Sequence, residues 1–260
     1  MLKKELEMMI KASKLAQEKI LEIYNHGFDV EIKSDDSPVT IADKTADALI
    51  KEVLSKEFPE YGFLTEESDD DLSRLDKEYI FIIDPVDGTK DFVSKNGQFT
   101  TNIGLVRNHK VVAGVINIPA TNETYYASLN QGAYYISSEG KVEKIHVNDK
   151  LSDLTMLISN FHTTKEELDI YEANKDRISE IKKCGSSIKA CHIAHGKAEV
   201  SFRMGPFTKE WDTSASQIIV TEAGGIFSEP SLKEITYNRE DVYNRNGFIV
   251  LNRVENKLNK

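Results

Sequence analysis

The chain has 260 residues, of which 40% are hydrophobic and 29% charged, and its formal net charge is −10 at pH 7. This composition predicts a globular protein with a substantial core, and the negative charge disfavours the binding of nucleic-acid backbones, which depends on many Lys and Arg contacts. No apolar run is long enough to cross a bilayer and no signal-peptide pattern begins the chain, so we expect a cytoplasmic protein, free or peripheral at the inner face of the membrane.

The two cysteines, Cys184 and Cys191, have no partners at metal-ligand spacing. They are typical of structural thiols in a reducing compartment. The composition is compatible with a monomer or a homodimer.

The first part of the chain predicts two helices separated by a polar loop. Apolar residues recur every three or four positions over residues 2–24, which is typical of an amphipathic helix. The polar loop at residues 34–43 delivers Asp43 to the start of a second helix that runs to about residue 58. A short apolar run then ends in Glu66 and its neighbour Glu67.

Residues 79–83 are almost entirely apolar and predict a strand that is covered on both faces. The motif Asp84-Pro-Val-Asp-Gly-Thr89 follows directly. We expect its proline to end the strand and its glycine to make a tight turn, so that two carboxylates and the Val86 carbonyl converge. Such hard oxygens suit Mg²⁺ or Mn²⁺. An ordinary acidic turn is the alternative for this motif alone.

Beyond the motif, the pattern of elements changes once. Short β-like runs predict a mostly antiparallel sheet from residues 99–106, 111–118, 124–128, 133–136 and 142–147. Strands and helices then alternate, with strands at 156–159, 178–182, 198–202 and 226–227 and helices at 164–175, 186–196 and 212–223. We expect an N-terminal α+β lobe at residues 1–150 and a C-terminal α/β lobe at residues 151–260, with a cleft between them.

Motifs spread over most of the chain resemble the signature of the magnesium-dependent, lithium-sensitive phosphomonoesterase superfamily that includes inositol monophosphatase and fructose-1,6-bisphosphatase. They are Asp43, Glu66-Glu67, Asp84-Pro-Val-Asp-Gly-Thr89, Trp211-Asp212 and Gly224-Gly225. The segments Gly185-Ser-Ser-Ile-Lys189 and Gly88-Thr-Lys90 are similar to those of the CysQ-type 3′(2′),5′-bisphosphate nucleotidases. Thr65 and Ser214 depart from the pattern without affecting an implied ligand.

The resemblance implies a layered αβαβα sandwich and a phosphatase site. It assigns metal binding to Glu66, Asp84, the Val86 carbonyl, Asp87 and Asp212, with most of these ligands in the N-terminal lobe. It implies two or three Mg²⁺ ions, with Mn²⁺ as a substitute and Li⁺ as an inhibitor. Asp43 and Thr89 would prepare the attacking water, with Asp43 accepting the hydrogen bond of the weakly basic threonine hydroxyl.

The implied reaction removes the 3′-phosphate of 3′-phosphoadenosine 5′-phosphate, a by-product of sulfate activation and transfer, and leaves AMP. The substrate would be bound by Gly88, Thr89, His162, Ser186, Lys189, Arg203 and Asp212. Ser186 is expected at a helix start, one turn before Lys189, where backbone amides favour an anion. Four of these residues also have an ordinary interpretation: a solvated helix lysine, a loop or capping histidine, a surface arginine, and an N-cap for Asp212.

Three alternatives compete with this interpretation. An inositol or sugar phosphatase of the same fold differs in whether adenosine contributes to catalytic efficiency. A haloacid-dehalogenase-type enzyme also places an acidic motif after an apolar strand, but its two acids are two residues apart, whereas Asp84 and Asp87 are three apart. A metal-dependent nucleotide-binding regulator without turnover would not need both Asp43 and Thr89.

Overall fold

The computed structural model describes residues 2–32 and 38–259. Residues 34–37 of the expected polar loop lie outside the described part of the chain. The helices are α1 (Lys3–His26), α2 (Ile41–Glu57), α3 (Thr89–Val93), α4 (Lys165–Ala173), α5 (Ile188–Ala194) and α6 (Glu210–Glu222). None of the helices in the described ranges is both long and apolar enough to cross a membrane.

A seven-stranded sheet forms the first β layer. Its strands are β3 (Gly62–Thr65), β4 (Tyr79–Asp87), β5 (Thr100–Arg107), β6 (Lys110–Ile118), β7 (Glu123–Ser128), β8 (Gly132–Ile136) and β9 (Val142–Ile145), in that spatial order. β3 pairs with β4 in parallel and every other pair is antiparallel, as the strand pattern predicted. The strands β1 (Val30–Ile32) and β2 (Pro38–Thr40) form a separate antiparallel pair.

A five-stranded sheet forms the second β layer, in the order β11-β10-β12-β14-β13. Its strands are β10 (Leu154–Ile158), β11 (Ile178–Lys183), β12 (Val200–Arg203), β13 (Ile226–Ser228) and β14 (Phe248–Leu251). Along β10, Met156 and Ile158 pack in one apolar cluster with Ile170 of α4. Leu157 points the other way, into a cluster with Ile188 of α5. This alternation places helices on both faces of the sheet.

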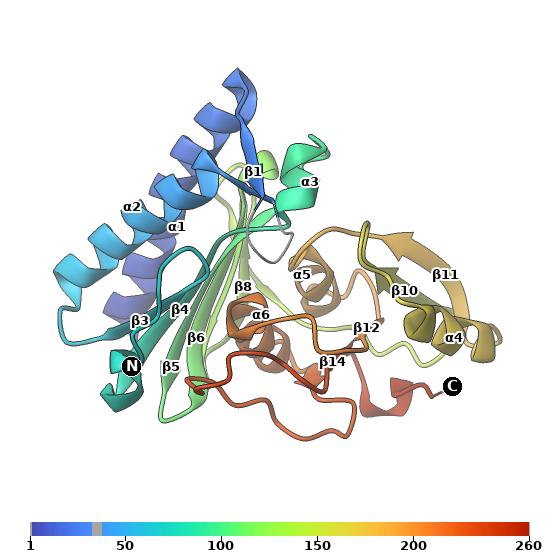
Figure 1. Cartoon of the computed structure of the whole chain (residues 1–260). Coiled ribbons are helices and arrows are strands. Elements are labelled where there is room, and N and C mark those ends of the chain that lie inside the picture. The colour runs from blue at the N-terminus through green and yellow to red at the C-terminus, as the bar shows by residue number, and fades with distance from the viewer. Residues whose placement is uncertain (1, 33–37, 260) are drawn as a thin grey trace.

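The layers follow one another as α1 and α2, the seven-stranded sheet, α5 and α6, the five-stranded sheet, and α4 (Figure 1). This arrangement confirms the αβαβα sandwich. α6 belongs to the C-terminal part of the chain but packs on β5 and β6 of the first sheet. The helix therefore joins the two sheets, and the division into lobes at residue 150 stays a prediction.

The contact between α6 and the first sheet depends on two glycines. A Cβ added to Gly104 of β5 would lie 2.8 Å from the Ser214 Cβ, and one added to Gly114 of β6 would lie 2.9 Å from the Ala215 Cα. Both distances are shorter than ordinary van der Waals contact. The bare backbone of the two strands at these glycines therefore lies directly against α6, at the Ser214 side chain and the Ala215 backbone.

The prediction that Pro85 ends its strand is wrong. β4 continues to Asp87, and its pairing with β5 skips from the pair Asp84 and Asn102 to the pair Asp87 and Thr100. Because a bulge leaves residues without ladder partners, it accommodates a proline, which has no N–H to donate. The Pro85 carbonyl instead accepts a hydrogen bond of 2.8 Å from the Thr101 hydroxyl.

Candidate active site

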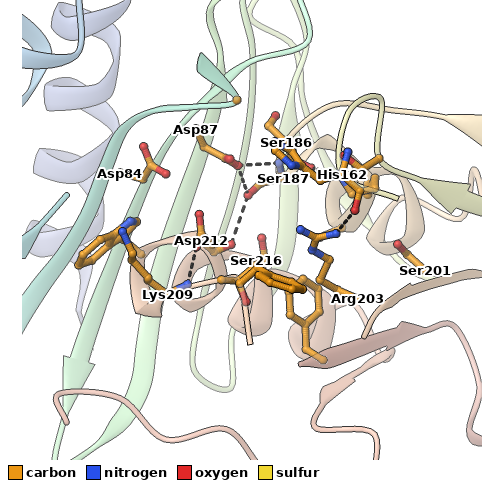
Figure 2. A pocket seen from close by; sticks show the side chains of 18 of the residues that line it. Asp84, Asp87, His162, Ser186, Ser187, Ser201, Arg203, Lys209, Asp212 and Ser216 are labelled. Carbon is orange, nitrogen blue, oxygen red and sulfur yellow. Dashed lines mark hydrogen bonds between the residues drawn. The ribbon is translucent and has the colours of Figure 1, made fainter. Parts of the chain in front are cut away.

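Three carboxylates from distant parts of the chain form the centre of the site. Asp84 and Asp87 lie at the end of β4, and Asp212 lies in the first turn of α6. One oxygen of each lies within 4.8 Å of the others. Figure 2 shows the three side chains converging on one side of the cleft. Carboxylate oxygens in this arrangement are typical ligands of small, hard divalent cations.

The electrostatics of these acids test whether a cation fits. Burial, followed by the charge of Glu66 and then that of Asp87, raises the pKa of Asp84 well above its ordinary value. Burial and the charges of Asp87 and Glu66 likewise raise the pKa of Asp212 to about 8. Such mutual repulsion is relieved when a cation lies between the carboxylates. The donor set and its charge therefore fit a divalent metal.

Glu66 and Val86 reach the same place from neighbouring strands. Glu66 follows β3, and its N–H donates to the Ile83 carbonyl of β4 at 3.2 Å. Glu66 and Val86 both line the cleft that contains the three aspartates. The structure thus brings together the five residues expected as metal ligands, while their coordination of an ion stays a prediction.

Asp87 is held by donors from both halves of the chain. Its Oδ2 accepts from the amide of Asn102 of β5 at 3.1 Å, while the Thr100 hydroxyl lies 3.3 Å from this oxygen but only 2.9 Å from the Asn102 side-chain oxygen, to which it donates. Asp87 Oδ2 also accepts from the backbone N–H and the hydroxyl of Ser187, each at 2.8 Å. Hydrogen bonds to a carboxylate are stronger than those between neutral groups, so this set restrains the orientation of Asp87.

Asp43 lies in the first turn of α2, where a capping box holds it. Its Oδ2 accepts from the Thr40 backbone N–H at 2.8 Å and from the Thr40 hydroxyl at 2.7 Å. Its Oδ1 lies 3.4 Å from the Thr89 hydroxyl, which is also 3.3 Å from the Val86 carbonyl. Burial raises the pKa of Asp43 above its ordinary value, and the Thr40 hydrogen bonds oppose this effect. The expected Asp43–Thr89 pair is therefore present.

The helix that carries Asp212 begins earlier than predicted. α6 starts at Glu210 with Lys209 as its N-cap, whereas the sequence pattern placed the start at residue 212. Asp212 is therefore not the N-cap. Its Oδ2 instead accepts from the Lys209 backbone N–H at 2.5 Å, as the third residue of a capping box. This bond occupies one carboxylate oxygen.

An open cleft of about 710 Å³ extends from the acids toward the C-terminal part of the chain. Its lining includes all of the expected substrate-binding residues: Gly88, Thr89, His162, Ser186, Lys189, Arg203 and Asp212. The cleft also contains the positive charges that an anionic ligand requires, from Lys90, Lys189, Arg203 and Lys209.

Ser186 and Lys189 do not lie as predicted. α5 begins at Ile188, with Ser187 as its N-cap, so Ser186 precedes the helix with a φ of 42°. Its buried hydroxyl has no hydrogen-bond partner among the described residues. Lys189 is half-buried, and its ammonium donates to the carbonyls of Cys184 at 3.1 Å and Ser186 at 2.7 Å. Lys189 therefore stabilises the loop before α5 and is not a solvated helix residue.

Arg203 and His162 face the acids across the cleft (Figure 2). The Arg203 guanidinium donates to the His162 carbonyl and lies 3.5 Å from a Glu167 oxygen. Burial, with the charges of Lys90 and Arg203, lowers the pKa of the His162 ring. The arginine is partly neutralised by Glu167, but its position on the cleft wall is the expected one.

Sequence reasoning missed Ser187 and Asn102, which hold Asp87. The signal for Ser187 was its place in the Gly185-Ser-Ser segment, where only the first serine was singled out. Asn102 gave no signal, because polar side chains at alternate positions also occur in ordinary strands. The free cysteines, by contrast, are both buried as expected, and burial raises the pKa of the Cys184 thiol to about 11.

Comparison with known proteins places this site in a family context. The model of the Inositol monophosphatase family matches residues 1–259. The 3′(2′),5′-bisphosphate nucleotidase CysQ of Aggregatibacter actinomycetemcomitans is 32% identical over 94% of this chain and 91% of its own length. The protein of the same name from Salmonella typhimurium is 33% identical over 94% of this chain and 98% of its own length.

A solved structure agrees with these sequence relatives. The crystal structure of CysQ from Bacteroides thetaiotaomicron, described as a bacterial member of the inositol monophosphatase family, superimposes with a TM-score of 0.81. It is 35% identical, and the match covers 96% of this chain and 98% of that one. The resemblance seen in the motifs is therefore confirmed, and the chain is a phosphatase that belongs to the inositol monophosphatase family.

Proposed function

We propose that this phosphatase is a Mg²⁺-dependent nucleotidase that hydrolyses the 3′-phosphate of 3′-phosphoadenosine 5′-phosphate and releases AMP and phosphate. The observation that carries the proposal is the cleft that joins the acid cluster to Arg203, to Lys189 and to the Ser186 hydroxyl, which has no partner among the described residues. Arg203 faces the acids across this cleft, so a ligand with two phosphates matches the groups on its two walls. The printed names of the CysQ relatives support this choice of substrate.

The metal-binding residues would be Glu66, Asp84, Asp87, Asp212 and the Val86 carbonyl. A divalent cation bound there would neutralise phosphate charge and activate a water molecule. Hydrogen bonds from neighbouring backbone N–H groups hold the three aspartates in place despite their repulsion, so the cluster is formed before a ligand arrives. Two or three Mg²⁺ ions would bind, Mn²⁺ would substitute and Li⁺ would inhibit.

Asp43 and Thr89 would orient the attacking water. Thr40 fixes Asp43 Oδ2, which leaves Oδ1 to accept the proton of the Thr89 hydroxyl. The Thr89 oxygen then has its lone pairs available to accept a hydrogen bond from the water. Because burial raises the pKa of Asp43, the carboxylate is a stronger base than an exposed aspartate.

The other phosphate of the substrate would lie near Ser186, Lys189 and Arg203. The Ser186 hydroxyl would gain the partner that it lacks among the described residues. The Arg203 guanidinium would bind the anion in its planar, forked geometry, with Glu167 holding the arginine from behind. Recognition energy would then come from a group that does not react.

The experiment that tests this function is phosphate release from a substrate panel with and without Mg²⁺. The panel contains 3′-phosphoadenosine 5′-phosphate, its 5′-phosphosulfate analogue, adenosine 3′-monophosphate, inositol 1-phosphate and fructose 1,6-bisphosphate. We expect the highest kcat/KM with 3′-phosphoadenosine 5′-phosphate and its 5′-phosphosulfate analogue, and no phosphate release without the metal. A preference for inositol or sugar phosphate would refute the nucleotidase proposal and favour the alternative substrates.

A further inference from the structure

Ser187, which directly precedes the short helix α5, makes an unusual set of contacts for its position. It is the N-cap of α5, but its side chain makes no capping hydrogen bond. A serine at this position usually accepts from a backbone N–H of the first turn and stabilises the helix by about 1 kcal/mol. Here the hydroxyl is directed away from its own helix, toward Asp87 (Figure 2).

The hydrogen bonds around Ser187 have a defined direction. The Asn102 amide donates to the Ser187 hydroxyl oxygen at 2.9 Å. The hydroxyl proton is therefore available for Asp87 Oδ2, which lies 2.8 Å away, while the Asp212 carbonyl is more distant at 3.5 Å. Together with the Ser187 backbone N–H and the Asn102 amide, this arrangement directs three donors to one oxygen of Asp87. Its other oxygen, Oδ1, accepts none of these hydrogen bonds.

Contacts of the chain just before Ser187 fix the distance between Ser187 and Asp87. Gly185 donates its N–H to the Gln98 side-chain oxygen at 2.8 Å, and a Cβ on Gly185 would lie only 2.8 Å from the Asp91 Cγ. Asn160 donates to both Gln98, at 3.0 Å, and Asp91, at 2.5 Å. The segment between β4 and β5 is thus tied to the chain just before Ser187.

We propose that Ser187 is a positioning residue for the metal site: it holds Asp87 Oδ2 so that Oδ1 faces the neighbouring carboxylates and is presented to a cation. The inference rests on the proposed metal site and adds a residue that does not touch the metal. Donors to the outer oxygen of a metal-binding carboxylate fix its orientation and its charge, and their loss typically lowers metal affinity by about 10–100-fold.

The test compares Mg²⁺ binding by the wild-type protein, Ser187→Ala and Ser187→Thr, measured by calorimetry and by the rise in Tm that Mg²⁺ causes. We expect Mg²⁺ affinity to fall by about 10-fold or more in the alanine variant and to recover in the threonine variant, which retains the hydroxyl. Near-saturating Mg²⁺ should restore most of kcat, with KM for the nucleotide little changed. Ser187→Cys, which keeps the volume but weakens the donor, replaces the alanine variant if that protein does not fold.

A matched control is Ser13→Ala. Ser13 is also buried, and its hydroxyl donates to a backbone carbonyl, that of Ile10, at 2.9 Å within α1, outside the cleft. Its loss should lower the Tm equally with and without Mg²⁺. If the Ser187 variants behave in the same way, with wild-type Mg²⁺ affinity, the positioning role is refuted. A wild-type protein that does not bind Mg²⁺ would instead refute the metal site on which the inference rests.

Discussion

Substitution of Gly185 by alanine should damage the active site without changing any of its functional groups. The new Cβ would lie 2.8 Å from both the Asp91 Cγ and the Gln98 Cβ, and closer still to the Gln98 carbonyl oxygen. The Gln98 carbonyl oxygen and Cβ are fixed to the backbone, so no side-chain rotation can move them away from the new Cβ. The loop and the start of α5 must therefore separate by about 0.5–1 Å to restore van der Waals contact.

The cost follows from two effects. Overpacking of this kind costs about 1–3 kcal/mol, and loss of the hydrogen bond from Gly185 to Gln98 costs about 1 kcal/mol more. For a protein of this size, a total of about 2–4 kcal/mol lowers the Tm by roughly 4–16 °C. Because Ser187 moves with Gly185, Asp87 loses its restraint, and a displacement of about 1 Å near reacting groups lowers the rate by about 10²-fold.

The assay is kcat/KM at saturating Mg²⁺ together with the Tm in the presence and absence of Mg²⁺. Gly140→Ala is the control, because Gly140 has a φ of 81° and no atom near its Cβ position, so alanine there costs only about 1 kcal/mol of backbone strain. We expect the control to retain wild-type activity. A Gly185→Ala protein with wild-type kcat/KM and an unchanged response to Mg²⁺ would refute the argument that this backbone contact sets the geometry of the site.

The remaining predictions concern the acids and the threonine. Asp212→Asn should abolish turnover at any Mg²⁺ concentration but raise the Tm of the metal-free protein. The change relieves repulsion between the carboxylates, and the amide oxygen can still accept from the Lys209 backbone N–H. Unchanged turnover would remove Asp212 from the site. Thr89→Ala should lower kcat by about 10²-fold or more with little change in Mg²⁺ affinity or KM, and a change confined to KM would contradict the proposed orientation of water. In the metal-free protein the pKa of Asp212 is about 8, which lies above its value in the unfolded chain. This group therefore stabilises the fold at acidic pH, and its contribution is lost as the pH rises from about 4 to about 8. Asp212→Asn should flatten that part of the plot of Tm against pH. Mg²⁺ binding at pH 7 should accordingly release protons, which calorimetry in buffers of different ionisation enthalpy would detect, and the absence of release would contradict the raised pKa.

Hydrophobic periodicity was sufficient to predict many of the individual elements, whereas the αβαβα layering was implied by the family resemblance. The apolar stripe of residues 2–24 and the apolar run before Asp84 predicted α1 and β4, because both elements bury faces of regular period. β14 was missed although it is a short apolar run at residues 248–251. In the structure it lies between β12 and β13, and the local sequence does not indicate that these distant segments pair with it.

Predictions of the site failed where backbone geometry depends on tertiary contacts. Ser186 was expected on a helix, but the close approach of Gly185 to Gln98 precedes a backbone turn with positive φ, and α5 begins two residues later. Pro85 was expected to end β4, but the bulge opposite β5 accommodates it. In both places the residues expected in the site do line one cleft, and their roles stay predictions, while the local backbone is set by contacts with segments distant in the sequence.

The glycine contacts beneath α6 have a consequence for the size of ion that the site can accept. Mg²⁺ binds oxygens at about 2.0–2.1 Å and Ca²⁺ at about 2.3–2.6 Å, so a larger ion requires the carboxylates to move apart by a few tenths of an ångström. Asp212 is carried by a helix that packs directly on the bare strand backbone at Gly104 and Gly114, and Asp84 and Asp87 belong to the same sheet. Side chains on the strands would let the helix tilt as they changed rotamer, whereas bare strand backbone leaves the helix no such freedom. If the aspartates bind an ion as proposed, the two glycines would limit the ionic radius that the site accepts without touching the ion.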